Sequence, residues 1–369
     1  MIADALRRDP AHVTPLAQLV HGKTAGNPFF VLQFLYTVAE EGLLRFDHDA
    51  ACWSWDLARI HDKGYTDNVA DLMAGKLIRL PVETQQALQQ LACLGNVAAV
   101  AMLSIVLDTS EEHVHAALWP AAHLELVERL EGAYKFIHDR VQEAAYSLIP
   151  EASRAVVHLL IGRLLVTQTP PEKREEAIFE IVNQMNRGAA LITLQEEREQ
   201  LAELNLIAGK RAKESTAYAS ALTYLNAGAA LLAGDSWERR HELIFELELL
   251  RAECEFVTGA MAAADERLKG LSTRASNTVE RASVACLHID LYTTLAQSSR
   301  AIAVGLDYLR HLGIEWSPHP TDEDVRREYD RFWLQLGSRA IEDMLELPLM
   351  TDPASLATID VLTKIAPAA

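Results

Sequence analysis

Apolar residues recur at intervals of three and four along most of this chain, which is the period of an amphipathic helix. Met261, Ala264, Leu268 and Leu271 are one clear example. Half of the residues are hydrophobic and 23% are charged, an ordinary globular composition with enough apolar material for real cores. A chain of 369 residues suits two or three domains of ~100–200 residues each. We therefore expect a mainly α protein with more than one domain.

Residues 1–67 begin with two helices. The stretch 12–21 has helical spacing, and the tripeptide Gly26–Pro28 interrupts it. A second apolar face covers residues 29–38 and stops near Gly42, a residue type that often ends helices.

Two short β-prone runs, 43–46 and 52–55, follow the second helix and predict a small hairpin. Trp53 and Trp55 alternate along the second run, so they share one face of the strand. Packing of these rings onto the neighbouring helix is the simpler interpretation, and stacking on a ligand is the alternative.

Residues 68–150 predict a winged-helix-like domain, because helices are followed by a short strand pair and a closing helix. The expected helices cover residues 69–80, 84–94, 103–107, 113–118 and 139–149, and the strands cover 124–130 and 134–137. This segment carries five Lys or Arg against ten Asp or Glu. A DNA-binding winged helix carries basic residues on its recognition helix, whereas this segment is acidic. We therefore interpret the domain as a spacer or a protein-contact unit.

Residues 151–369 are helical in pattern throughout. Ala221, Ala264 and Ala301 each lie in a similar run of small and apolar residues, where small side chains let paired helices approach closely. These alanines are 43 and 37 residues apart, which suits tetratricopeptide-like helical repeats with variable loops better than a uniform array of about 34 residues per repeat. An unrepeated helical bundle is the alternative.

The charge and the cysteines limit the function classes. A formal net charge of -18 gives a surface that repels nucleic acid and anionic lipid heads. The N-terminal residues lack an apolar signal core, and the longest apolar run, 97–107, is too short to span ~30 Å of hydrocarbon. The four cysteines form no C-x-x-C pair, which indicates reduced thiols. We expect a cytoplasmic protein with no nucleic-acid or membrane partner.

Gly22-Lys23-Thr24 resembles the end of a phosphate-binding P-loop. The complete pattern needs a glycine five positions earlier, where this chain has Ala17. Residues 15–20 also have a helical pattern, whereas a phosphate cradle lies between a strand and a helix. We therefore expect no P-loop here and no ATP hydrolysis by this chain alone.

His138 and Asp139 are consistent with two chemical roles. One is a phospho-accepting histidine, and the other is a general acid/base pair. Adjacent helical residues point roughly 100° apart, so the two do not form a dyad on one face. We favour a helix start, with Asp139 near the positive end of the helix dipole. His113 and His115 indicate a solvated face rather than a metal site. We assign no catalytic residue and no metal ligand.

Several longer strings carry a family resemblance, namely GNPFFVLQFLYTVAEEGLLRFD, DNVADLMAGKLIRLPVETQQALQQLACLGN, YKFIHDRVQEAAYSLIP and AGKRAKESTAYASALTYL. They closely resemble the central region of large bacterial multidomain signalling proteins. In those, a serine/threonine kinase-like domain precedes an AAA-type ATPase of the STAND (signal-transduction) class, and helical repeats, a GAF sensor and a histidine kinase follow. The resemblance implies that residues 1–67 are the C-terminal lid portion of the ATPase with its hairpin.

The resemblance also implies a site. In related ATPases a G-x-P motif in the lid lies against the adenine of the bound nucleotide, which gives Gly26, Asn27 and Pro28 a nucleotide-facing role. ATP and Mg²⁺ are the cofactors of the intact family, and none is expected for this chain alone. The family's P-loop and acidic strand precede this motif, so we expect the chain to be a fragment with truncated repeats.

Three functions remain open at this point. The first is a non-catalytic regulatory segment that couples nucleotide state to partner or signal binding, with protein partners on the helical repeats and a possible oligomer. The second is an ATP-binding component of a serine/threonine or histidine kinase whose catalytic domains lie on adjacent polypeptides. The third is a fragment of an ATPase-type transcriptional regulator.

Overall fold

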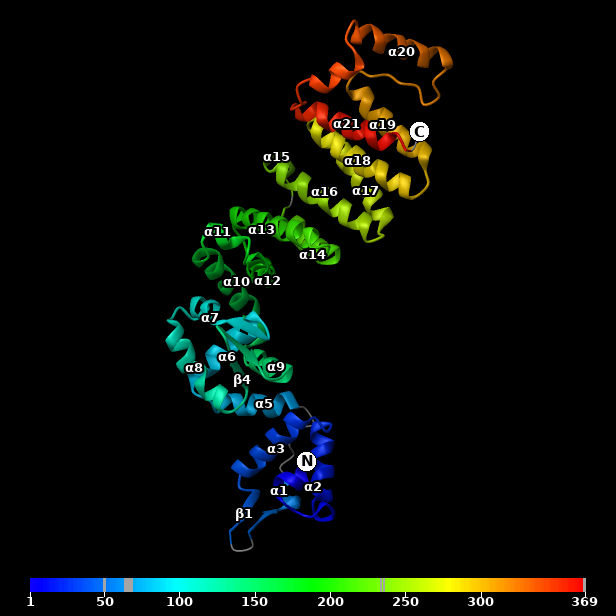
Figure 1. Cartoon of the computed structure of the whole chain (residues 1–369). Helices are drawn as coiled ribbons and strands as arrows, with labels where there is room; N and C mark the ends of the chain where they lie inside the picture. Colours follow the sequence, from blue (N-terminus) through cyan, green and yellow to red (C-terminus); the bar gives the residue numbers. More distant parts are fainter. Residues whose placement is uncertain (49–50, 63–68, 233, 235, 368–369) are drawn as a thin grey trace. The chain divides into compact units, whose positions relative to one another are not determined.

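The computed structural model describes residues 1–48, 51–62, 69–232, 234 and 236–367. Within them the fold is mainly α, with small antiparallel sheets. The chain divides into two compact units, Met1–Leu191 and Ile192–Ala369, which follow each other along the colour scale of Figure 1. The predicted boundary between residues 67 and 68 lies outside the described residues. Helices of the predicted repeat segment up to Leu191 belong to the first unit.

The first unit begins with helices and a hairpin, as the sequence predicts. The elements are α1 (Ile2–Leu6), α2 (Pro10–Thr24), α3 (Pro28–Glu40), β1 (Leu44–Asp47), β2 (Cys52–Trp55) and α4 (Leu57–Asp62). Strands β1 and β2 are antiparallel, with Leu44 opposite Trp55. Trp53 and Trp55 pack against the core made by Leu16, Phe34 and their neighbours, so the packing interpretation of the two rings is confirmed.

A second group of elements in this unit has the order of a winged-helix-like domain. It comprises α5 (Val69–Ile78), α6 (Val82–Leu94), β3 (Val97–Ala99), α7 (Val100–Leu107), α8 (Glu111–His123), β4 (Val127–Leu130), β5 (Ala133–Phe136) and α9 (Asp139–Ser147). The strands form an antiparallel sheet in the order β3-β5-β4. The sequence predicts the β4–β5 hairpin and the surrounding helices, but β3 was not predicted.

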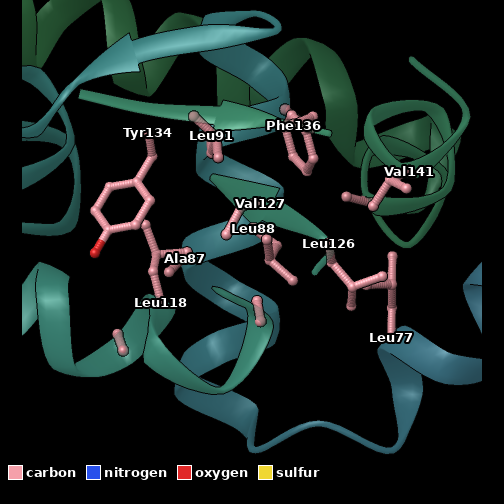
Figure 2. Close-up of a cluster of buried hydrophobic side chains, with 14 of the residues drawn as sticks. Leu77, Ala87, Leu88, Leu91, Leu118, Leu126, Val127, Tyr134, Phe136 and Val141 are labelled. Carbon is pink, nitrogen blue, oxygen red and sulfur yellow. The ribbon is translucent and has the colours of Figure 1, made fainter. Parts of the chain in front are cut away.

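The core of this group lies between α6 and the sheet. Leu88 and Leu91 of α6 are fully buried, and Figure 2 shows them among side chains from α8, the sheet and α9. Phe136 is the largest fully buried side chain that the sheet contributes. Its position fixes β5 over α6 and thereby places the loop that leads into α9.

The first unit closes with α10 (Glu151–Gln168), α11 (Pro171–Arg174), α12 (Ile178–Arg187) and the short 3₁₀ helix η1 (Ala189–Leu191). Helices α10 and α12 pack closely where α12 ends. A Cβ on Gly188 would lie 2.6 Å from the carbonyl oxygen of Ala155. Only glycine therefore fits at that position without a shift of the α10 backbone.

The second unit is a series of helical hairpins. Its elements are α13 (Gln195–Glu214), α14 (Tyr218–Leu231), α15 (Ser236–Arg239), α16 (His241–Val257), α17 (Met261–Ser272), α18 (Thr278–Thr294), α19 (Ser298–His311), α20 (Asp322–Leu336), η2 (Ile341–Glu346) and α21 (Pro353–Ile365).

The hairpins are α13/α14, α16/α17 and α18/α19, and they give the unit an α-solenoid architecture. Ala221, Ala264 and Ala301 are fully buried, each on the second helix of its hairpin, so the predicted repeat of small residues is confirmed. Helix α15 lies between Ala221 and Ala264, the longer of the two intervals between these alanines. Among the described residues, no helix combines the length and the apolar composition needed to cross a membrane.

Candidate functional site

The tripeptide Gly26-Asn27-Pro28 forms the turn between α2 and α3. Gly26 has φ +76°, a left-handed conformation that favours glycine, and a Cβ there would also lie 3.1 Å from His21 Cδ2. Asn27 is the N-cap of α3, where its Oδ1 accepts a hydrogen bond of 3.0 Å from the backbone N–H of Phe29. Pro28 occupies the first helical turn, where a missing N–H costs no helix hydrogen bond.

The start of α3 lies against His138, the residue that begins α9. His138 is the N-cap of α9, and its Nδ1 accepts a hydrogen bond of 3.2 Å from the backbone N–H of Arg140. The predicted helix start is therefore confirmed. The ring of Phe29 stacks on the imidazole at 5.6 Å with an interplanar angle of 10°, and the ring of Phe30 lies 4.6 Å away. Phe29 also packs against the core around α6.

The Asn27 side chain completes this contact. Its Nδ2 lies 3.3 Å from His138 Nε2. A neutral imidazole accepts a hydrogen bond at only one ring nitrogen, so the Asn27 amide and the Arg140 N–H compete for the acceptor role of His138. The nucleotide-facing motif of the sequence analysis and the start of α9 thus meet in one cluster, which we call the α3–α9 contact: Asn27, Phe29, Phe30 and His138.

A second polar contact anchors the middle of α3. Gln33 is buried, and its Oε1 accepts a hydrogen bond of 2.7 Å from Lys76 Nζ on α5. Burial lowers the pKa of Lys76, which Glu40 partly offsets. Helix α3 is therefore held to the winged-helix-like elements at its start and at its centre.

Gly22-Lys23-Thr24 lies in the last turn of α2. The hydroxyl of Thr24 donates a hydrogen bond of 2.8 Å to the carbonyl oxygen of Val20, one turn earlier. The backbone of this tripeptide is helical rather than looped between a strand and a helix. Residues 15–20 lie in the same helix, so the helix predicted for them is confirmed. Among the described residues, no group of three or more His, Cys, Asp or Glu is arranged to hold a metal ion.

A buried polar network lies beside α9, and no pattern in the sequence indicated it. Gln184 donates through Nε2 to the Cys93 carbonyl oxygen at 2.8 Å, which leaves its Oε1 to accept from His158 Nδ1 at 2.6 Å. His158 Nε2 then accepts from the Tyr146 hydroxyl at 2.9 Å. Burial lowers the pKa of His158, which suits this neutral tautomer. Tyr146, Gln184 and Arg187 also line a cavity of about 490 Å³.

A signalling protein is similar to 94% of this chain. No family model matches it. Hybrid signal transduction histidine kinase G of Dictyostelium discoideum is 25% identical over 407 aligned positions, which include 94% of this chain. The chain is similar to a segment of a signalling protein. It spans 12% of that relative's length.

Among solved structures, one match is a signal transduction ATPase with numerous domains (STAND) that carries a tetratricopeptide repeat sensor, from Pyrococcus horikoshii. It is 12% identical, with a TM-score of 0.33, and the match covers 92% of this chain and 57% of that chain.

Proposed function

We propose that this chain is a non-catalytic regulatory segment of a larger signal-transduction ATPase–kinase. In this proposal Gly26, Asn27 and Pro28 face a nucleotide, the winged-helix-like elements transmit its state, and the helical repeats bind a protein partner. The α3–α9 contact is the observation that carries the proposal. A ligand that moves the start of α3 would move the Phe29 ring, on which His138 and hence the first turn of α9 rest.

The character of α8 supports protein contact over nucleic-acid contact. This helix occupies the place of a recognition helix, and its sequence contains no Lys or Arg. Its first turn carries Glu111 and Glu112, and Trp119 is 68% exposed. Exposed tryptophan is typical of protein interfaces, whereas DNA readers need cationic side chains at this position.

The second unit supports a protein partner on the repeats. Helix α20 is amphipathic, yet none of its residues is buried. Tyr329, Phe332 and Trp333 are each at least 40% exposed along one face of it. Aromatic anchors on an exposed helix face are suited to insertion into a groove on another protein.

The transmission step is tested by Phe29→Ala. Loss of one aromatic pair should speed amide exchange at Arg140 and Val141 by roughly 2- to 10-fold, because the capping imidazole loses its stacked neighbour. Hydrogen exchange followed by NMR measures this. Leu32→Ala, at a 39% exposed position of the same helix, is the matched control and should leave α9 unchanged. Unchanged exchange at the start of α9 in Phe29→Ala would contradict the relay.

The catalytic alternative, an ATP-binding kinase component, is tested by calorimetry of the purified chain with ATP and Mg²⁺. We expect no saturable binding in the micromolar range, because Gly22-Lys23-Thr24 is helical and offers no loop of inward-pointing N–H groups. Micromolar, Mg²⁺-dependent affinity would overturn the non-catalytic proposal and favour the kinase component.

A further inference from the structure

The second unit contains a cavity of about 450 Å³ between the end of α17, α18 and α19. That volume lies in the range of small-molecule sites, which is roughly 300–1,000 Å³. All three helices belong to the hairpin series, and Figure 1 shows α18 and α19 side by side. The cavity is therefore part of the repeat architecture and not a gap at a chain end.

The two ends of this cavity differ in chemistry. Helices α18 and α19 form a hairpin, so the start of α18 lies beside the end of α19. Arg281 from the start of α18 and Arg310 and His311 from the end of α19 line the first end. Val284 lies one turn further along α18, and His288, Ala303 and Val304 line the opposite end, where the two aliphatic side chains come from α19.

The cationic end holds an excess of positive charge. Arg281 donates through Nε to the Ala275 carbonyl oxygen at 3.4 Å, which directs its guanidinium along the α17–α18 connection. Arg310 donates to Asp307 at 2.9 Å, and Asp307 is the carboxylate of the lining. Both partners of that ion pair are more than half exposed, so the pair is weak and easily exchanged for another anion. One unit of positive charge is left over in a chain of net charge -18.

A rigid wall borders the apolar end. His288 lines the cavity and is 6% exposed. Its Nε2 donates a hydrogen bond of 2.8 Å to the Asp265 carboxylate, which fixes the orientation of the imidazole. Burial lowers the pKa of His288, so the ring adds no charge to this end. His288 is thus a fixed part of the lining before any ligand arrives.

We propose that this cavity binds a small organic carboxylate with an apolar body. The carboxylate group lies at Arg281 and Arg310, and the hydrocarbon extends past Val284 toward Ala303 and Val304. Guanidinium groups match carboxylates in geometry and charge, and the apolar end of the cavity buries the hydrocarbon of the ligand. This site is independent of the proposed nucleotide relay and would give the helical repeats a small-molecule signal.

Calorimetry of the full chain with octanoate tests the site. We expect saturable binding in the millimolar range or tighter, with octanol and octylamine each at least roughly 10-fold weaker, since each loses the charge-assisted hydrogen bonds. No saturable octanoate binding, or equal binding of octanol, overturns the proposal. This comparison uses the unmodified chain, so its outcome does not depend on how a variant folds.

Two variants then locate the ligand. Arg281→Gln should weaken octanoate binding by roughly 10-fold or more, and Val304→Trp should abolish it by filling the apolar end. Arg326→Gln, on the exposed face of α20 and away from the cavity, is the matched control and should bind as the unmodified chain does. Unchanged affinity in both cavity variants would place the ligand elsewhere and overturn the assignment.

Discussion

Phe136→Ala should lower the free energy of unfolding of the first unit by about 3–5 kcal/mol. Phe136 is 0% exposed, and Figure 2 shows its ring among the buried side chains of this core. Truncation removes the transfer free energy of the ring and leaves a cavity that Leu88, Leu91 and Val141 cannot fill without leaving their own contacts.

Because the chain has two compact units, a single melting curve does not report on one of them. Hydrogen exchange resolves the units. Amides of α6 and β5 in Phe136→Ala should exchange roughly 100- to 5,000-fold faster, the equivalent of the lost stability. Amides of α16 and α18 should not change. Ile137→Ala is the matched control, since its side chain is 41% exposed and adjacent in sequence. Equal effects of the two variants would contradict the core assignment.

Local signals account for most of the elements that the sequence predicted. The turn at Gly26–Pro28 and the stop near Gly42 set the bounds of α3, because both depend on the backbone preferences of the residues themselves. The alternating Trp53 and Trp55 likewise marked β2. In the second unit, small residues such as Ala264 were detectable because close helix packing repeats the same requirement in each hairpin.

Elements that depend on distant partners were not predictable. Strand β3 belongs to the apolar run 97–107, which only Ser104 interrupts, and is a strand because Val97 pairs with Lys135 of β5. The α3–α9 contact joins Asn27 to His138, which are 111 residues apart. The sequence predicted a turn at the first residue and a helix start at the second, but no local pattern indicates that they meet. Helix α20 is the opposite case. The helical spacing of its apolar residues predicts a buried face, but none of its residues is buried.

Asp265→Ala should lower the free energy of unfolding of the second unit by about 2–6 kcal/mol, because two buried donors lose their acceptor at about 1–3 kcal/mol each. Asp265 Oδ1 accepts from His288 Nε2 at 2.8 Å and from the Tyr292 hydroxyl at 2.6 Å. His288 and Tyr292 are 6% and 3% exposed, so both donors are largely shielded from solvent. Arg300 also donates to the Tyr292 hydroxyl and stacks over its ring at 4.0 Å.

Hydrogen exchange of α18 amides measures this change. Glu266→Ala is the matched control, since Glu266 is the next residue, is 76% exposed and contacts Lys269 alone among these groups. We expect its effect to stay within about 0.5 kcal/mol, as for other surface substitutions. Tyr292→Phe removes one of the two donors. It should lower the free energy of unfolding by about 1 kcal/mol, an effect between those of Glu266→Ala and Asp265→Ala. An Asp265→Ala variant no less stable than Glu266→Ala would show that the buried network does not stabilise the hairpins.

The same carboxylate makes the second unit sensitive to acid. Burial disfavours the charged form of Asp265, but hydrogen bonds from Lys269, Tyr292 and His288 outweigh it and hold the pKa of Asp265 below its ordinary value of 3.8. Between the folded and the unfolded pKa the unfolded chain binds more protons, so the stabilisation is complete above about pH 4 and is lost as the pH falls below that value. The stability difference between the unmodified chain and Asp265→Ala should therefore shrink as the pH falls below about 4, the ordinary carboxyl pKa. If this stability difference instead grows as the pH falls below about 4, Asp265 takes up its proton more readily in the folded state than in the unfolded chain.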